Sequence, residues 1–316
     1  MKPIIAPIDK KLIEKELTIN KFLRYTNNGD NLLYIVNHED SPNTMLEIGR
    51  LREIAFRAAG GGTGESVDID EFDISREHYY SQLIVWDPKE REILGGYRYI
   101  ACNNISAGDL ATAELFGFSD KFVKNYLPKT IELGRSFVQP NYQTTRLRSK
   151  GLYALDNLWD GLGALILRHP DMNYFLGKVT MYGTFNTEAR DMLLYFLRKH
   201  FSDSENLITP IEPLKTNPDL DKLNKLLVGK TYKDDYRILA RAIRAFGENI
   251  PPLINSYMNL SPSMKVFGTA INHGFGNVEE TGILIKISDI YAEKIDRHLG
   301  PIFKMVKKLR RLRRKQ

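Results

Sequence analysis

Hydrophobic positions recur along the chain with two different periods, and each period predicts one kind of element. Apolar runs of strand length, alternating or continuous, predict strands at 31–36, 81–87, 93–102, 131–139, 174–185, 264–272 and 282–288. Apolar positions three and four residues apart predict helices at 45–59, 149–168, 186–201, 234–246 and 250–259.

Turn and cap residues mark several of these boundaries. The turn PKERE joins strands 81–87 and 93–102, which predicts a β-hairpin. Three glycines end the helix at 45–59, and Asn186 is a suitable N-cap for the helix that follows it. Proline and asparagine punctuate the chain after residue 201, so we expect a helical excursion over about 202–260.

The order of strands and helices predicts a mixed α/β fold (an α+β sandwich) rather than a repeated βαβ unit. Mostly antiparallel strands come first, and a single βαβ crossover follows them. This order is typical of the N-acetyltransferase-like (GNAT) fold, in which helices flank a mixed, mostly antiparallel central sheet. We therefore expect one domain over residues 1–303 and a separate tail at 304–316.

The composition, with 42% hydrophobic and 27% charged residues, is that of a soluble globular protein. No run of about 18 apolar residues occurs, so no transmembrane helix is expected. Asp9 and several lysines break the short apolar stretch at the N-terminus, so no signal peptide is expected. The single cysteine, Cys102, excludes an intramolecular disulfide and fits the cytoplasm, and we expect it to be buried on a strand.

Positive charge is concentrated in the C-terminal tail. Its thirteen residues, KMVKKLRRLRRKQ, contain eight cations and no acid, and subtracting these eight from the net charge of +6 leaves −2 on residues 1–303. Apolar residues interleave with the cations, which predicts an amphipathic helix that binds an anionic membrane surface from Lys304 to Lys315. A solubilising tail is the alternative, and nucleic-acid binding is not expected because the body has no basic helix or zinc pattern.

The segment RAAGGGTG (57–64) spells R-x-x-G-x-G, the pattern with which acyl-CoA N-acyltransferases hold a pyrophosphate. It lies before the hairpin and at the C-terminus of its helix, where the helix dipole repels anions. We therefore expect it to end the helix and to lead the chain toward Asp70 and Asp73, rather than to bind phosphate.

Strand 131–139 carries two charged residues in an otherwise largely apolar sequence. Alternation would place Glu132 and Arg135 on opposite faces, unless a bulge at Gly134 brings them together. A charged pair in a central strand needs partners or a function, so we predict that both residues belong to a catalytic site.

Partners for this pair lie upstream in the sequence. Arg52 is on the first helix, Asp70 and Asp73 follow the glycines, and Arg98 lies in the hairpin. All four fall on elements that would surround one cleft together with strand 131–139. Asp70, Asp73 and Arg98 are therefore candidate catalytic residues, although Arg52 and the two aspartates fit a structural ion-pair network equally well.

These residues resemble the charged signature of the acyl-homoserine-lactone synthases, which have the N-acetyltransferase-like fold: Arg52-x-x-x-Phe56, Asp70-x-x-Asp73, Arg98 and Glu132-x-x-Arg135. The segments ELGRSFVQPNY (132–142), LWDGL (158–162) and PPLINSY (251–257) are similar to the ornithine-lipid and glycine-lipid N-acyltransferases, often labelled hemolysin-like. The ordered series covers about residues 30–290. It departs from that family at Asn272, where an aspartate is expected.

The resemblance implies transfer of a (3-hydroxy) fatty acyl group from acyl carrier protein to the α-amine of an amino acid, glycine or ornithine. This would be the first step of an amino-acid-containing membrane lipid, made by an enzyme peripheral to the inner face of the cytoplasmic membrane. The donor would be acyl-phosphopantetheine, so no tightly bound cofactor is expected, and the histidine spacing suggests no metal site. Phe56 and Trp159 would contact substrate or donor.

Such a reaction needs only a few groups. Glu132 is the expected base for the ammonium, directly or through one water. Arg98 or Arg135 is expected to bind the carboxylate of the acceptor. Backbone N–H groups around Phe137 and Val138 are expected to stabilise the oxyanion. A tyrosine could protonate the leaving thiolate, but the sequence singles out none of the sixteen.

The loop that opens the helix at 149–168 is the expected phosphate site, because helix N-termini favour anions. There, Arg148-x-x-Gly151-x-Tyr153 is a degraded R-x-x-G-x-G pattern with a bulky last residue. This crowding suits the single phosphodiester of phosphopantetheine better than the pyrophosphate of coenzyme A. Arg146, Arg148 and Lys150 would also attract an acidic carrier protein.

Two other functions fit the sequence. One is a different acyltransferase of the same fold, either a signal-lactone synthase or an acetyl-CoA-dependent N-acetyltransferase. The other is a protein without catalytic activity that binds a membrane or nucleic acid through its tail.

Overall fold

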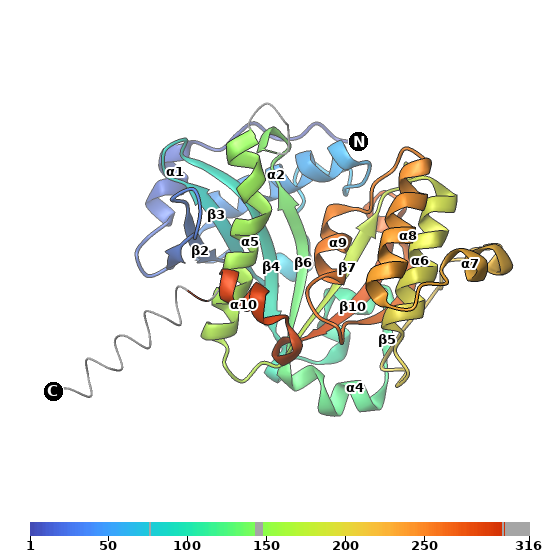
Figure 1. The fold of residues 1–316 in the computed structure, drawn as a ribbon. Helices are drawn as coiled ribbons and strands as arrows, with labels where there is room; N and C mark the ends of the chain where they lie inside the picture. Colours follow the sequence, from blue (N-terminus) through green and yellow to red (C-terminus); the bar gives the residue numbers. More distant parts are fainter. Residues whose placement is uncertain (76, 143–147, 299, 301–316) are drawn as a thin grey trace, which may run out of the picture.

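Eight strands form one continuous sheet in the computed structural model (Figure 1), in the order β1-β2-β3-β4-β6-β7-β10-β9. The strands are β1 (Phe22–Tyr25), β2 (Leu32–Val36), β3 (Ser81–Asp87), β4 (Glu92–Ala101), β6 (Thr130–Val138), β7 (Tyr174–Met181), β9 (Lys265–Asn272) and β10 (Val278–Lys286). All neighbours are antiparallel except β6 and β7. The structure describes residues 1–75, 77–142, 148–298 and 300, with only the backbone at 148–155.

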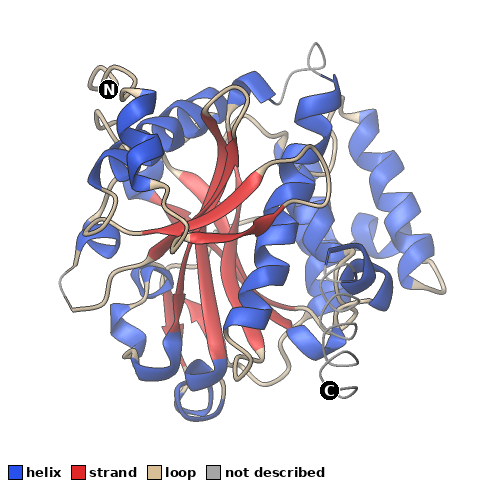
Figure 2. Cartoon of the chain, turned by 90° about the vertical axis from the view of Figure 1, so that its left-hand side faces the viewer, coloured by secondary structure: helices blue, strands red, loops and turns tan. Residues whose placement is uncertain are grey.

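Helices cover both faces of this sheet (Figures 1 and 2). On one face, α2 (Pro42–Ala59) packs its apolar side, including Ile48 and Leu51, against β3. The other face is covered by α5 (Arg148–Arg168), α6 (Thr187–Phe201), α8 (Tyr232–Ala245) and α9 (Pro252–Met258). The mostly antiparallel sheet between helical layers confirms the predicted fold class.

Shorter elements fill the rest of the described chain. They are α1 (Lys10–Glu16), α3 (Glu71–Ile74), α4 (Asp120–Asn125), α7 (Leu220–Leu226), α10 (Ala292–His298) and a two-stranded sheet of β5 (Phe116–Phe118) with β8 (Ile208–Pro210). The segment predicted as a helical excursion at 202–260 contains β8, α7, α8 and α9. Among the described residues, no helix combines the length and the apolar character that crossing a bilayer requires.

Several predicted boundaries are confirmed and others shift. Asn186 caps α6 by accepting hydrogen bonds from two backbone N–H groups. The strand predicted to reach residue 185 ends at Met181, because the chain turns there before entering α6. The last strand begins at Val278 rather than 282, and Cys102 is buried in a 3₁₀ turn directly after β4 rather than on the strand. α1 and β1 were not predicted, since both are short.

The parallel pair β6–β7 positions the site. β6 pairs with β7 only from Thr130 to Leu133, whereas β6 stays paired with β4 as far as Val138. The second half of β6 therefore leaves β7, and a gap opens in the middle of the sheet.

A β-bulge lies in the same half of β6. The pairing with β4 shifts between Gly96 and Arg98, opposite an extra residue on β6, and Arg135 there has φ +48°. Gly95 allows the close approach that the bulge needs, because a Cβ at this position would lie 2.4 Å from the carbonyl oxygen of Phe137. The predicted bulge is confirmed, with its left-handed residue one position after Gly134.

Candidate active site

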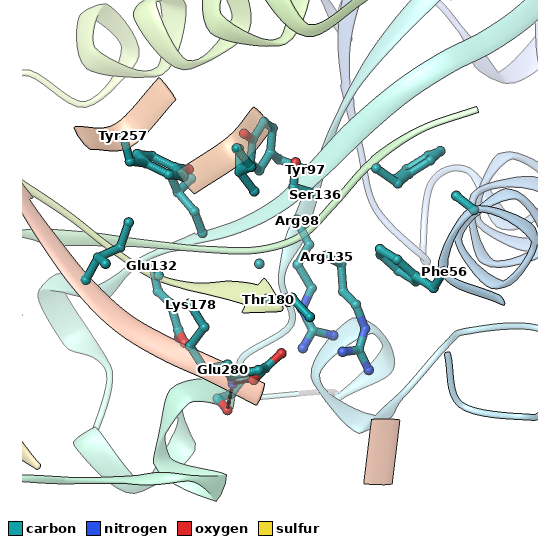
Figure 3. A pocket seen from close by; sticks show the side chains of 18 of the residues that line it. Phe56, Tyr97, Arg98, Glu132, Arg135, Ser136, Lys178, Thr180, Tyr257 and Glu280 are labelled. Carbon is teal, nitrogen blue, oxygen red and sulfur yellow. Dashed lines mark hydrogen bonds and ion pairs between the residues drawn. The ribbon is translucent and has the colours of Figure 1, made fainter. Parts of the chain in front are cut away.

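A cavity of about 460 Å³ occupies the gap between β6 and β7 (Figure 3). Its walls come from α2, β4, β6, β7, β10 and α9. Residues from both faces of the sheet line it, so the cavity passes through the sheet. One end is charged and lies on the α3 side, and the other end is largely apolar and lies beneath α9.

The charged end collects one ionisable residue from each of four neighbouring strands. Arg98 lies on β4, Glu132 on β6, Lys178 on β7 and Glu280 on β10, and all four line the cavity. Their contacts show that they share one face. Lys178 Nζ lies 3.5 Å from Glu280 Oε2, while the Arg98 guanidinium lies over the ring of Tyr80, whose hydroxyl bonds Glu132.

The bulge adds Arg135 to this face. Its Nε lies 3.0 Å from Asp68 Oδ2, and its Nη2 lies 3.3 Å from Asp70 Oδ2. The guanidinium also lies 4.2 Å from the ring centre of Phe275. Regular alternation would have turned Arg135 away from Glu132, so the bulge brings the two predicted residues to one cavity wall.

A short helix, α3, holds the arginines in place. Asp70 and Asp73 form its capping box, and both Asp70 oxygens lie 2.6 Å from Arg98 Nη1. Asp73 accepts from the fully buried Arg52 at 2.9 Å. Burial opposes ionisation of Asp70, but the charges of Arg98 and Arg135 outweigh it and lower its pKa to about 2. The five residues therefore form an ion-pair network, which we call the α3 clamp.

Glu132 is held by donors on the α3 side. Its carboxylate accepts hydrogen bonds from the backbone N–H of Thr112 at 2.8 Å, from the Thr112 hydroxyl, and from the hydroxyl of Tyr80. Tyr80 in turn accepts from the N–H of Ala111 at 3.0 Å. Burial, and then the negative charge of Glu132, raise the pKa of Tyr80 well above its usual value. Tyr80 is therefore a protonated phenol in direct contact with Glu132.

Three hydroxyl groups lie toward the apolar end. In Figure 3, Tyr97, Tyr257 and Ser136 lie on the side of the cavity opposite the charged residues. The Tyr97 hydroxyl is buried beside the other two and interacts with both, although neither contact has regular hydrogen-bond geometry. Trp159 packs on Tyr257 from outside the cavity, with 5.3 Å between the ring centres. It therefore supports the cavity wall rather than lining it.

The glycine loop at 57–64 already binds a carboxylate with its N–H groups. Gly60 ends α2 in a left-handed conformation, as predicted. The carboxylate of Glu53 already accepts from the N–H groups of Thr63 and Gly64 and from Arg57 Nε, at 2.7 to 3.0 Å. Burial opposes the charge of Glu53, but these hydrogen bonds outweigh it and lower its pKa. The loop binds a carboxylate of its own helix, which confirms that R-x-x-G-x-G is not a phosphate site here.

The predicted donor loop lies largely outside the described residues. Arg146 is not described, and α5 begins at Arg148, with the side chains of Arg148 and Lys150 outside the described part. Gly151 falls in the first turn of this helix. A role for these residues in phosphate or carrier binding stays a prediction.

The other predicted site residues gather at or directly behind the cavity. Those that line it are Phe56, Arg98, Glu132, Arg135, Phe137 and Val138. Arg52, Asp70 and Asp73 belong to the α3 clamp behind it.

Sequence reasoning missed Asp68, Tyr80, Lys178 and Glu280. Lys178 carries the same signal as Glu132, a charge within an apolar strand. Glu280 was missed because the last strand was predicted to begin at residue 282, which is after Glu280. The described chain contains no cluster of three or more potential metal ligands.

Comparison with known proteins shows the family of the chain. A family model described as an acetyltransferase (GNAT) domain matches residues 51–150. A glycine N(alpha)-acyltransferase from Bacteroides thetaiotaomicron is 57% identical over 95% of this chain and 90% of its own length. A protein of the same name from Phocaeicola vulgatus is 54% identical over 96% of this chain and 94% of its own length.

Two similarities are more distant. An L-ornithine N(alpha)-acyltransferase from Agrobacterium fabrum is 26% identical over 74% of this chain and 72% of its own length. The crystal structure of the AHL synthase LasI is 10% identical, covering 85% of this chain and 95% of that one with a TM-score of 0.36. The two relatives at 57% and 54% identity, together with the matching family model, show that the chain is an acyltransferase with a GNAT-like fold and belongs to the family of the glycine N(alpha)-acyltransferases.

Proposed function

We propose that this protein transfers a long-chain acyl group from the thioester of acyl carrier protein to the α-amine of glycine. The observation that supports this most is the cavity that passes through the sheet, charged at one end and apolar at the other. An amino acid suits the charged end and a hydrocarbon chain suits the apolar end. Its volume also falls within the range of about 300 to 1,000 Å³ that is usual for ligand sites. The relatives named above support glycine as the acceptor.

In the proposed reaction, the acceptor amine attacks the thioester carbonyl carbon in the gap between β6 and β7. A C–N bond forms and the C–S bond breaks. The ammonium gives up two protons, one of which ends on the departing thiol while the other is released. Glu132 takes the first proton, directly or through one water. Tyr80 is hydrogen-bonded to Glu132. It can donate its phenol proton to the departing sulfur and then take up the proton that Glu132 accepted.

The acyl chain is proposed to lie beneath α9. Leu133, Phe175, Ile283 and Ile285 supply an apolar wall there. The hydroxyl of Tyr97, together with those of Ser136 and Tyr257, is a polar position within this wall. A 3-hydroxyl on the acyl chain would find hydrogen-bond partners among these hydroxyls, which favours a 3-hydroxy fatty acyl donor.

The carrier and the membrane complete the proposal. Arg146, Arg148 and Lys150 are proposed to face the acidic carrier near the N-terminus of α5. The basic tail from Lys304 to Lys315 is proposed to hold the enzyme on the inner face of the cytoplasmic membrane. An N-acyl amino acid with one long chain partitions into that membrane, so the product would enter lipid synthesis where it is formed.

The proposal is tested with purified protein, 3-hydroxyacyl carrier protein and each of the common amino acids plus ornithine, with N-acyl products detected by mass spectrometry. We expect N-acylglycine as the main product, and less of it from the same acyl group on coenzyme A. Active carrier that yields no product with any amino acid would refute the proposal. Equal turnover from coenzyme A would refute carrier dependence alone.

A further inference from the structure

Two charged residues on the cavity wall take no part in the α3 clamp. Lys178 and Glu280 lie on the adjacent strands β7 and β10, with Nζ and Oε2 3.5 Å apart. Their side chains are only 15% and 6% exposed, and both line the cavity. In Figure 3 they lie on the same side as Glu132.

The hydrogen bonding of this pair is incomplete. Within the described chain, Lys178 donates one short hydrogen bond, to the carbonyl oxygen of Ala111 at 2.8 Å. Glu280 accepts from Asn272 Nδ2 at 3.4 Å and has Lys178 at 3.5 Å. An ammonium has three donors and a carboxylate about four acceptor positions, so both groups retain unused capacity.

The arginines of the site, in contrast, already have close carboxylate partners. Arg98 has both oxygens of Asp70 at 2.6 Å, and Arg135 lies between Asp68 and Asp70. Either guanidinium would have to give up a clamp carboxylate to bind a substrate carboxylate. Lys178 can accept a new anion without breaking an ion pair of the clamp, so it is the better ligand for the acceptor.

Stability does not explain the pair. A buried ion pair with long contacts recovers little of the cost of removing two charges from water. Such a pair is expected where a ligand with both charges completes it. The zwitterion of an α-amino acid is a ligand of that kind, because it carries an anion and a cation one carbon apart.

We propose that Lys178 and Glu280 form the acceptor site, where Lys178 binds the carboxylate and Glu280 the ammonium of a small α-amino acid. This inference rests on the proposed acyl transfer and adds the groups that recognise the acceptor. One 3₁₀ turn, Ala111–Glu114, connects the site to the base. Lys178 bonds Ala111 of this turn and Glu132 bonds Thr112, so the proposed acceptor site adjoins Glu132.

The first test compares glycine with glycinamide, which keeps the amine and lacks the carboxylate. In Lys178→Met, we expect kcat/KM for glycine to fall about 10- to 100-fold, as for loss of a charged hydrogen bond. The value for glycinamide should change little, so the preference for glycine is lost. Each variant is compared with the wild type at one pH, which cancels the different basicity of the two amines.

The second test addresses the ammonium. Glu280→Gln should raise KM for glycine and glycinamide alike, by about 10-fold, and leave KM for the donor unchanged. Glu279→Gln is the matched control, because Glu279 pairs with Arg190 and does not line the cavity. Lys265→Met is the control for Lys178, since Lys265 pairs with Asp203 and Glu205 away from the cavity. Both controls should behave as the wild type.

A variant that leaves one charge unpaired can misfold, so the double variant Lys178→Met/Glu280→Gln is made as well. It removes both charges at similar volume and should also lose the preference for glycine. Calorimetric binding of glycine and glycinamide, without donor, gives a readout independent of turnover.

The outcomes separate the inference from the proposed function. Wild-type acylation of glycine, with the preference intact in folded Lys178→Met or in the double variant, overturns the inference alone. An equal loss with glycine and glycinamide in Lys178→Met also overturns it. Glycine binding that depends on Lys178, without any acyl transfer, supports the inference and overturns the proposed function. A wild-type protein that neither binds nor acylates an amino acid overturns both.

Discussion

Arg135 adopts a left-handed backbone conformation in the middle of a strand. For a residue with a side chain this costs on the order of 1 kcal/mol or more, so other contacts have to stabilise it. Asp68, Asp70 and the ring of Phe275 supply them. The strain is thus maintained by the residues that Arg135 helps to position, as is common at functional sites.

Glu132 is the residue on which the proposed chemistry depends most. Glu132→Gln keeps the volume and can still accept from Thr112, but it has no carboxylate to take a proton. We expect kcat to fall by about 100-fold or more, with the far-UV circular dichroism unchanged. A folded Glu132→Gln variant with wild-type turnover would remove Glu132 as the base, and Glu279→Gln serves as the control on the other face of β10.

At the scale of elements, β6 and α3 act as one unit. β6 provides Glu132 and Arg135, and the four residues of α3 with their N-cap provide two carboxylates that fix Arg98, Arg135 and Arg52. α3 is too short to be stable alone, so its capping box and its ion pairs determine where it lies.

The lowered pKa of Asp70 predicts how this unit responds to acid. The carboxyl has a pKa of 3.8 when unperturbed and about 2 in the fold, so its contribution is complete above about pH 4. That contribution, about 2 kcal/mol, is lost as the pH falls toward about 2. The variant Asp70→Asn lacks this contribution at every pH. The difference in free energy of unfolding between wild type and variant should therefore shrink as the pH falls from about 4 to about 2.

Urea unfolding at a series of pH values measures this difference. Asp30→Asn is the control, because Asp30 is exposed and lies 3.9 Å from Lys89. A gap between wild type and Asp70→Asn that stays constant down to about pH 2 would contradict the assignment.

At the scale of the molecule, one topological feature makes the site. A fully antiparallel sheet could close over its whole length, whereas the parallel pair β6–β7 separates after four residues on each strand. Both faces of the sheet then reach one cavity. In the proposed reaction, the amino acid and the acyl chain approach the reacting carbon from opposite layers, which keeps a zwitterion and a hydrocarbon apart until they meet.

The basic tail belongs to this scale too. Deletion of residues 304–316 removes eight cations, each of which contributes about 1 kcal/mol near an anionic surface. We therefore expect binding to anionic vesicles to fall by at least about 100-fold, while kcat with soluble substrates stays unchanged. Vesicle sedimentation at two salt concentrations measures the first effect, and zwitterionic vesicles are the control. Undiminished binding of the truncated chain would refute a membrane role for the tail.

The sequence by itself determined most of the elements and some of the charged strand residues. The hydrophobic period and the capping residues are local properties. For this reason, the start of α6 at Asn186, the end of α2 at Gly60 and the hairpin of β3 and β4 could be predicted. A charge in an apolar strand is also a local signal, and it identified Glu132 and Arg135.

Only the tertiary structure decided which charges meet. The position of the bulge, the partners of Arg98, and the neighbours of Lys178 and Glu280 depend on strand register between segments far apart in the chain. Register is set by packing of whole layers, for which a sequence window contains no information. The gap between β6 and β7 also depends on pairing between distant segments, because β6 leaves β7 after Leu133 and stays paired with β4 as far as Val138.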